Sequence, residues 1–143
     1  MRSNLASLCF LESFKDEPHA YCKLWKHHAA QDHANRLNDI AKARNEKWLN
    51  NYGGKISSEW AIPKMWQVLE EAPEIYDEAD TFIEAADWII WQLTGQESRN
   101  ACTAGYKELW NKRTGFPSKD FFKALDPKLE NVVEDKLSEN IFS

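Results

Sequence analysis

The chain lacks the features that mark several large classes of protein. Its 143 residues include only three cysteines, Cys9, Cys22 and Cys102, and no CxxC pair, so neither a disulfide framework nor a cysteine-based zinc site is indicated. No apolar run approaches the roughly 20 residues that cross a bilayer, and the stretch from Leu5 to Leu11 is too short for a convincing signal peptide. We therefore expect free thiols in a cytoplasmic protein without a membrane partner.

The chain also lacks a basic face and the glycine-rich motifs of nucleotide binding. Its 18 Lys and Arg residues are outnumbered by 23 Asp and Glu residues, and the formal net charge of −5 is spread along the sequence. Nucleic acid is therefore not an expected partner. Neither a Walker loop, a GxGxxG motif nor a GxSxG nucleophile elbow is present, so the spacings by themselves indicate no catalytic chemistry.

Aromatic residues, by contrast, are abundant. Seven Trp, seven Phe and four Tyr accompany a hydrophobic content of 43%, a composition that disordered chains do not have. The length suits one domain with a packed core.

Apolar periodicity predicts several helices. A long amphipathic helix is expected from residues 29 to 52, ending at Gly53 and Gly54. A second helix should begin near Pro63 and close before Pro73. The segment from Glu84 to Gly95 has few polar residues around the helix circumference, which predicts a buried central helix that ends at Gly95.

Shorter elements complete the expected secondary structure. Ser118 and Asp120 suit the start of a helix holding Phe121, Phe122 and Leu125, and Asp126-Pro127 suits the start of another. Short strands are expected at residues 21–25, 81–83 and 101–106.

Three of the four histidines, His27, His28 and His33, lie within nine residues. Their steps of one and five do not place them on one helical face, whereas a pair of metal-ligating histidines on a helix is spaced four apart. We expect no metal site here and interpret these residues as polar groups that form ordinary hydrogen bonds near a helix start.

Five strings occur in an order that resembles the FGGY carbohydrate kinase family. They are HAYCKLWKHHAAQ (19–31), NNYGGKISSEWAIPK (50–64), FIEAADWIIWQLTG (82–95), RNACTAGYKELWNK (99–112) and GFPSKDFFKALDP (115–127). The resemblance is to members that phosphorylate L-ribulose, covers residues 19–143, and leaves residues 1–18 poorly matched. It implies an α/β fold: part of the actin-like (ribonuclease-H-like), sugar-side N-terminal domain, mostly helical with a few short strands.

The resemblance also implies an activity. Full-length members transfer a phosphoryl group from ATP, with Mg²⁺, to a sugar, here giving L-ribulose 5-phosphate in L-arabinose catabolism. The ATP and Mg²⁺ sites and the catalytic Asp would lie outside these residues, and we expect the chain alone to be inactive.

Three residues match sugar-contacting positions of the family. Lys107 matches the lysine directed at the bound ketopentose, where an ammonium can donate hydrogen bonds to two sugar oxygens. Trp25 matches an aromatic residue that stacks on the carbon face of the sugar. Glu59 falls where a related polyol kinase places a substrate-contacting tyrosine. The competing interpretations are a surface lysine, a structural tryptophan and a glutamate that caps the helix near Pro63.

One further function stays open. A helical protein-interaction module on a kinase-derived scaffold would bind a partner through exposed aromatic residues. Apolar surface left uncovered in a partial domain would also favour self-association.

Overall fold

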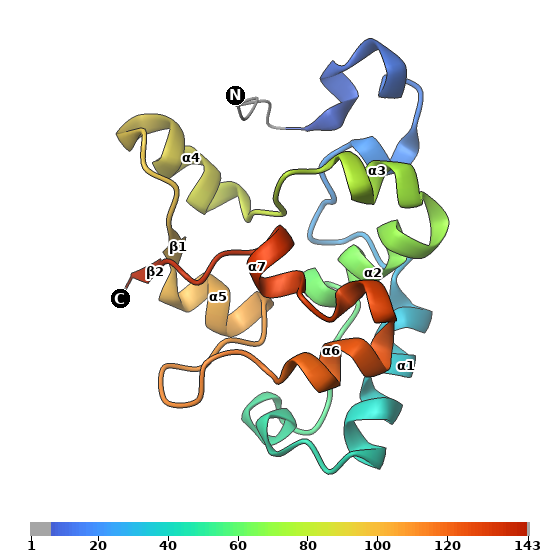
Figure 1. The fold of residues 1–143 in the computed structure, drawn as a ribbon, viewed down its shortest axis with the longest axis vertical. Coiled ribbons are helices and arrows are strands. Elements are labelled where there is room, and N and C mark those ends of the chain that lie inside the picture. Colours follow the sequence, from blue (N-terminus) through green and yellow to red (C-terminus); the bar gives the residue numbers. More distant parts are fainter. Residues whose placement is uncertain (1–6, 143) are drawn as a thin grey trace.

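The computed structural model describes residues 7–142 (Figure 1). Residues 1–6 and residue 143 lie outside the described residues. Residues 1–6 include the start of the poorly matched segment 1–18 and the first two residues of the Leu5–Leu11 stretch. In chain order the helices and strands are η1 (Leu8–Phe10), η2 (Glu12–Phe14), η3 (Pro18–Ala20), α1 (Gln31–Ala43), η4 (Lys47–Tyr52), α2 (Ala61–Glu71), α3 (Pro73–Glu78), α4 (Ala85–Thr94), β1 (Arg99–Asn100), α5 (Ala101–Lys107), α6 (Lys119–Leu125), η5 (Pro127–Leu129), α7 (Val132–Lys136) and β2 (Ile141–Phe142).

The core lies where α2 packs between its neighbours. Helix α2 contacts both α1 and α3, and α1 also contacts α6 (Figure 1). The Trp66 side chain is fully buried at the centre, together with Leu37 of α1 and Phe121 of α6. Burial of an aromatic side chain of this size contributes about 3 kcal/mol or more to stability, and the predicted helix near Pro63 is confirmed.

The long helix expected over residues 29–52 is wrong in its second half. Helix α1 ends at Ala43, Asn45 takes a left-handed conformation with φ 54°, and the chain continues as the separate 3₁₀ helix η4. Asparagine tolerates this conformation better than most residues, so the break needs no glycine. The predicted stop at Gly53 and Gly54 is confirmed, since both have positive φ.

Helix α4 is not the buried central helix that its apolar sequence predicts. Ile89, Ile90 and Leu93 are 51%, 49% and 78% exposed, and Asp87 is the residue of this helix that is buried. In Figure 1 the helix lies at the edge of the molecule, away from α1, α2 and α6. An all-round apolar sequence shows that a helix favours burial, but it does not show what covers the helix.

The three expected strands are also wrong. Residues 21–25 form no strand and contain one bend and the start of a turn, and residues 101–106 belong to α5. Residues 81–83 form no strand, although the Phe82 amide donates to the Lys136 carbonyl over 2.7 Å. The observed strands are β1 and β2, which pair in parallel with Arg99 opposite Ile141. The chain is still mostly helical with short strands, as the fold class predicted.

Asn100 explains why a helix follows β1. Its side chain accepts a hydrogen bond from the Cys102 amide over 2.7 Å, which caps the first turn of α5. The same rule confirms two predicted helix starts, because Ser118 caps α6 through the Phe121 amide and Asp126 caps η5.

A buried amide joins α1 to the segment that precedes α2. The Asn38 side chain donates to the Ile56 carbonyl over 2.8 Å and accepts from the Ile56 amide over 2.7 Å. These two bonds satisfy a backbone that forms no helix or strand there. They fix the path of residues 56–60, which include Glu59.

Candidate functional site

The three predicted site residues lie on three different segments. Trp25 lies in the turn-rich segment before α1 and is 70% exposed, Glu59 lies two residues before α2, and Lys107 is the last residue of α5. Fixed tertiary contacts are therefore needed to bring them to one surface.

Lys64, in the first turn of α2, connects these segments. Its Nζ donates to the Leu24 carbonyl over 3.0 Å, directly beside Trp25 in the chain. Burial lowers the pKa of Lys64, and the ammonium of Lys107 lowers it further, whereas the carboxylates of Glu84 and Glu59 raise it. The Lys64 ammonium thus lies next to the Trp25 segment and within electrostatic reach of both Glu59 and Lys107.

Lys64 is not among the site residues that the sequence predicts, although its position near the start of α2 is a signal. A cation in the first turn of a helix is opposed by the positive end of the helix dipole, so it needs a specific acceptor. The Leu24 carbonyl provides that acceptor.

A row of aromatic rings holds α5 against the start of α2. Tyr52 meets Trp60 edge to face with ring centroids 4.7 Å apart, and Trp60 lies 5.1 Å from Tyr106. The Tyr52 hydroxyl donates to the Gly105 carbonyl over 2.8 Å. The Nζ of Lys107 lies 5.4 Å from the Tyr106 ring. These contacts orient the end of α5 and its lysine.

Glu59 does not cap α2, contrary to the competing interpretation. The N-cap residue is Trp60, whose side chain makes no capping bond. The Glu59 carboxylate instead accepts from the Ser57 hydroxyl and lies 3.8 Å from Nδ1 of His28. The other carboxylate oxygen thus lies near the exposed His28, three residues after Trp25 in the chain.

The histidines have separate environments. His28 contacts the Ser58 hydroxyl over 3.3 Å, and Nε2 of the buried His33 lies 3.0 Å from the Glu70 carboxylate. The His33 ring also meets Trp66 edge to face at 5.5 Å. Within residues 7–142 no three His, Cys, Asp or Glu side chains converge as metal ligands would.

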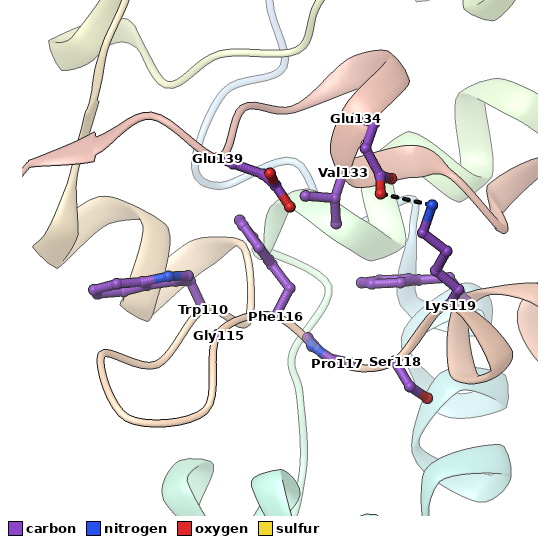
Figure 2. A pocket seen from close by; sticks show the side chains of 10 residues that line it. Trp110, Gly115, Phe116, Pro117, Ser118, Lys119, Val133, Glu134 and Glu139 are labelled. Carbon is purple, nitrogen blue, oxygen red and sulfur yellow. Dashed lines mark ion pairs between the residues drawn. The ribbon is translucent and has the colours of Figure 1, made fainter.

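A hollow of about 350 Å³ lies on another part of the molecule (Figure 2). Trp110 and Phe116 line one side, and the ion pair between Lys119 and Glu134, 2.6 Å long, lies opposite. None of the predicted site residues lines it. A second hollow, of about 340 Å³, is lined by residues between Pro18 and His27, among them Leu24 and Lys26, the two chain neighbours of Trp25. Trp25 itself does not line this hollow.

Comparison with known protein families identifies the family of the chain. The sequence profile of the FGGY family of carbohydrate kinases, N-terminal domain, matches residues 5–142, so the chain belongs to this family. None of the helices within residues 7–142 is both long and apolar enough to span a membrane.

The relatives carry a more specific name. A ribulokinase from Bacillus licheniformis is 59% identical over 140 residues, which are 98% of this chain and 25% of that protein. A ribulokinase from Geobacillus thermodenitrificans is 62% identical over 130 residues, 91% of this chain and 23% of that protein. One from Anoxybacillus flavithermus is 60% identical over 134 residues, 94% of this chain and 24% of that protein. The chain thus spans about a quarter of the length of the curated relatives it matches.

Proposed function

We propose that these residues form the sugar-side wall of a cytoplasmic, ATP-dependent L-ribulokinase. The whole enzyme would convert L-ribulose to L-ribulose 5-phosphate in L-arabinose catabolism. The observation that carries this proposal is the identity of about 60% to ribulokinases over nearly the whole chain. The sugar is proposed from the names of these relatives.

The geometry supports a role for each predicted residue. The exposed Trp25 ring offers an apolar face to the C–H groups of a sugar. Lys107 offers an ammonium that donates to sugar oxygens, and Glu59 offers a carboxylate that accepts from a sugar hydroxyl. Lys64 supports their proximity, because it bonds beside Trp25 and interacts electrostatically with the other two.

The proposed reaction needs groups that the described residues do not supply. Mg²⁺ bridges phosphate oxygens in kinases, and the chain spans only about a quarter of the length of its ribulokinase relatives. We therefore place ATP, Mg²⁺ and the catalytic base on other parts of the enzyme. The chain alone should show no L-ribulose-dependent release of ADP, and turnover in a coupled assay would contradict this.

Sugar binding can be tested on the chain itself. L-Ribulose is titrated into ¹⁵N-labelled protein, and the indole N–H signal of Trp25 is followed by NMR. We expect a saturable shift that Lys107→Met weakens at least five-fold, because it removes a donor to the sugar. Lys112→Met is the matched control, since Lys112 is exposed and its side chain forms no hydrogen bond or ion pair with the other described residues. A shift that is absent, or equally strong in Lys107→Met, would contradict the proposed site.

A second function is favoured by α4. Ile89, Ile90 and Leu93 form an exposed apolar surface on this helix, which suits a protein-interaction module or self-association. Light scattering of the wild-type chain and Leu93→Glu distinguishes the two. Association that rises with concentration and is lost in Leu93→Glu supports self-association, whereas a wild-type monomer excludes it.

A further inference from the structure

Two ionisable side chains are buried beside α5 and have no role in the site described above. Arg99 of β1 is 0% exposed, and Glu108, which follows α5 directly, is 1% exposed. Nη2 of Arg99 donates to the Thr81 hydroxyl over 2.9 Å and lies 3.2 Å from the Glu97 carboxylate. Among the described residues, Nε and Nη1 of Arg99 and Oε2 of Glu108 have no hydrogen-bond partner.

Such burial is costly for a carboxylate. Burial raises the pKa of Glu108 to about 7, the Arg99 guanidinium lowers it, and the carboxylates of Glu84 and Asp87 raise it further. These three side chains, from β1 and from the start of α4, are the charged groups that face Glu108. An apolar residue of the same size would avoid this cost, so the charge calls for another explanation.

The position of Glu108 at the end of α5 offers an explanation for this buried charge. Its amide donates to the Ala104 carbonyl over 3.0 Å and ends α5 directly after Lys107. The next residue, Leu109, is buried with φ 69°, a left-handed conformation that is unfavourable for a side chain with a β-carbon. Such an outlier persists only where surrounding contacts determine it. Two buried side chains, Glu108 and Leu109, thus follow Lys107 directly at the end of α5.

We infer that Glu108, opposed by Arg99, is a positioning residue that fixes the end of α5 and hence the point from which Lys107 reaches the sugar. This inference rests on the sugar-binding role proposed for Lys107. Glu108 itself touches no substrate, because its side chain is directed into the protein. The charge state of the buried carboxylate should accordingly change the environment of the Lys107 ammonium.

The inference is tested by NMR without sugar. Lysine side chains are labelled by reductive ¹³C-methylation, and the Lys107 signal is followed from pH 5.5 to 8.5 with the ¹³C signal of the Glu108 carboxyl. We expect both signals to change with one midpoint near pH 7. We expect the Lys107 change to disappear in Glu108→Gln, which keeps the shape and removes the charge. The Lys112 signal serves as the internal control.

Each outcome decides the inference. A Lys107 signal that does not change near the Glu108 midpoint overturns the inference. A change that persists in Glu108→Gln overturns it as well, because it then has another source. If Glu108→Gln does not fold, the wild-type protein still decides the inference, because the midpoints of its Lys107 and Glu108 signals either agree, which supports the inference, or differ, which overturns it. Sugar titrations at pH 6 and pH 8 are then compared. An NMR change without sugar binding contradicts the proposed function alone, and binding without the NMR change contradicts the positioning role alone.

Discussion

Replacing Glu70 with Gln tests how much the polar contacts between α1 and α2 stabilise the fold. The Glu70 carboxylate accepts from Nη1 and Nη2 of Arg36 over 2.8 and 2.7 Å and lies 3.0 Å from Nε2 of His33. The Arg36 guanidinium also lies 4.1 Å from the centre of the Trp66 ring. One carboxylate thus orders a cation that covers the central aromatic residue of the core.

The expected loss of stability follows from the geometry and the exposure. A buried bond to a charged group contributes about 1.5–3 kcal/mol, and an exposed ion pair about 0.2–1 kcal/mol. The side chains of Glu70 and Arg36 are 33% and 48% exposed, so we expect Glu70→Gln to cost about 1–2 kcal/mol at pH 7.

The effect should depend on pH with a definite sign. The hydrogen bond from Arg36 is the main cause that lowers the pKa of Glu70, and the charge of Arg36 and His33 lowers it further, while burial opposes them. A lowered folded pKa gives stability that is present above the unfolded value of about 4.3 and is lost as the pH falls through the folded value. The difference between wild type and Glu70→Gln should therefore shrink between pH 7 and pH 3.

Urea unfolding followed by tryptophan fluorescence measures this difference. Glu74→Gln is the matched control, because Glu74 is exposed and its side chain forms no hydrogen bond or ion pair with the other described residues. It should change stability by less than about 0.5 kcal/mol. A loss that is equal at both pH values, or no loss at pH 7, would refute the reasoning about charge.

Three further substitutions test separate features. Asn38→Ala should cost about 2–3 kcal/mol in urea unfolding, because it leaves the buried amide and carbonyl of Ile56 without their partner; a loss below about 0.5 kcal/mol would contradict this. Gly95→Ala should cost about 1 kcal/mol through the backbone alone, since φ is 72° and nothing lies within 4 Å of an added Cβ; a thermal melt with no loss would contradict it. Glu108→Gln should gain about 3 kcal/mol of unfolding free energy relative to wild type as the pH rises from 4 to 8. The folded wild type keeps the proton of Glu108 up to a pKa of about 7, so wild-type stability falls through this pH range, whereas that of the variant does not. Parallel stability curves of the two proteins would count against this.

Local rules predicted the parts of this fold that depend on neighbouring residues. The α2 helix, the caps at Ser118 and Asp126, and the stop at Gly95 were correct, because each is decided within one helical turn. Residues 101–106 were assigned to a strand because the cap at Asn100 was overlooked. The predicted burial of α4 is wrong for a different reason. Apolar periodicity shows that a helix favours burial, but it does not show which other part of the protein lies beside the helix.

The candidate site likewise combines residues that the sequence predicts with long-range contacts that it does not predict. The family resemblance predicts the sugar-contacting roles of Trp25, Glu59 and Lys107, and these contacts stay predictions. The contacts that connect their segments are long-range. They join Lys64 to Leu24 across 40 positions and Tyr52 to Gly105 across 53. No local pattern reports such contacts, so the sequence analysis missed them.

The short pairing of β1 with β2 has a consequence for how the molecule opens. A two-residue parallel contact joins residues that are 42 positions apart, so few hydrogen bonds oppose the entropy of a long closed loop. Water entering there would hydrate the otherwise dry guanidinium of Arg99 at once, which favours the opened form. Amide protons at this junction should therefore exchange with deuterium well before those of α2, and the carboxyl-terminal end should detach as a local unit while the helical core remains folded.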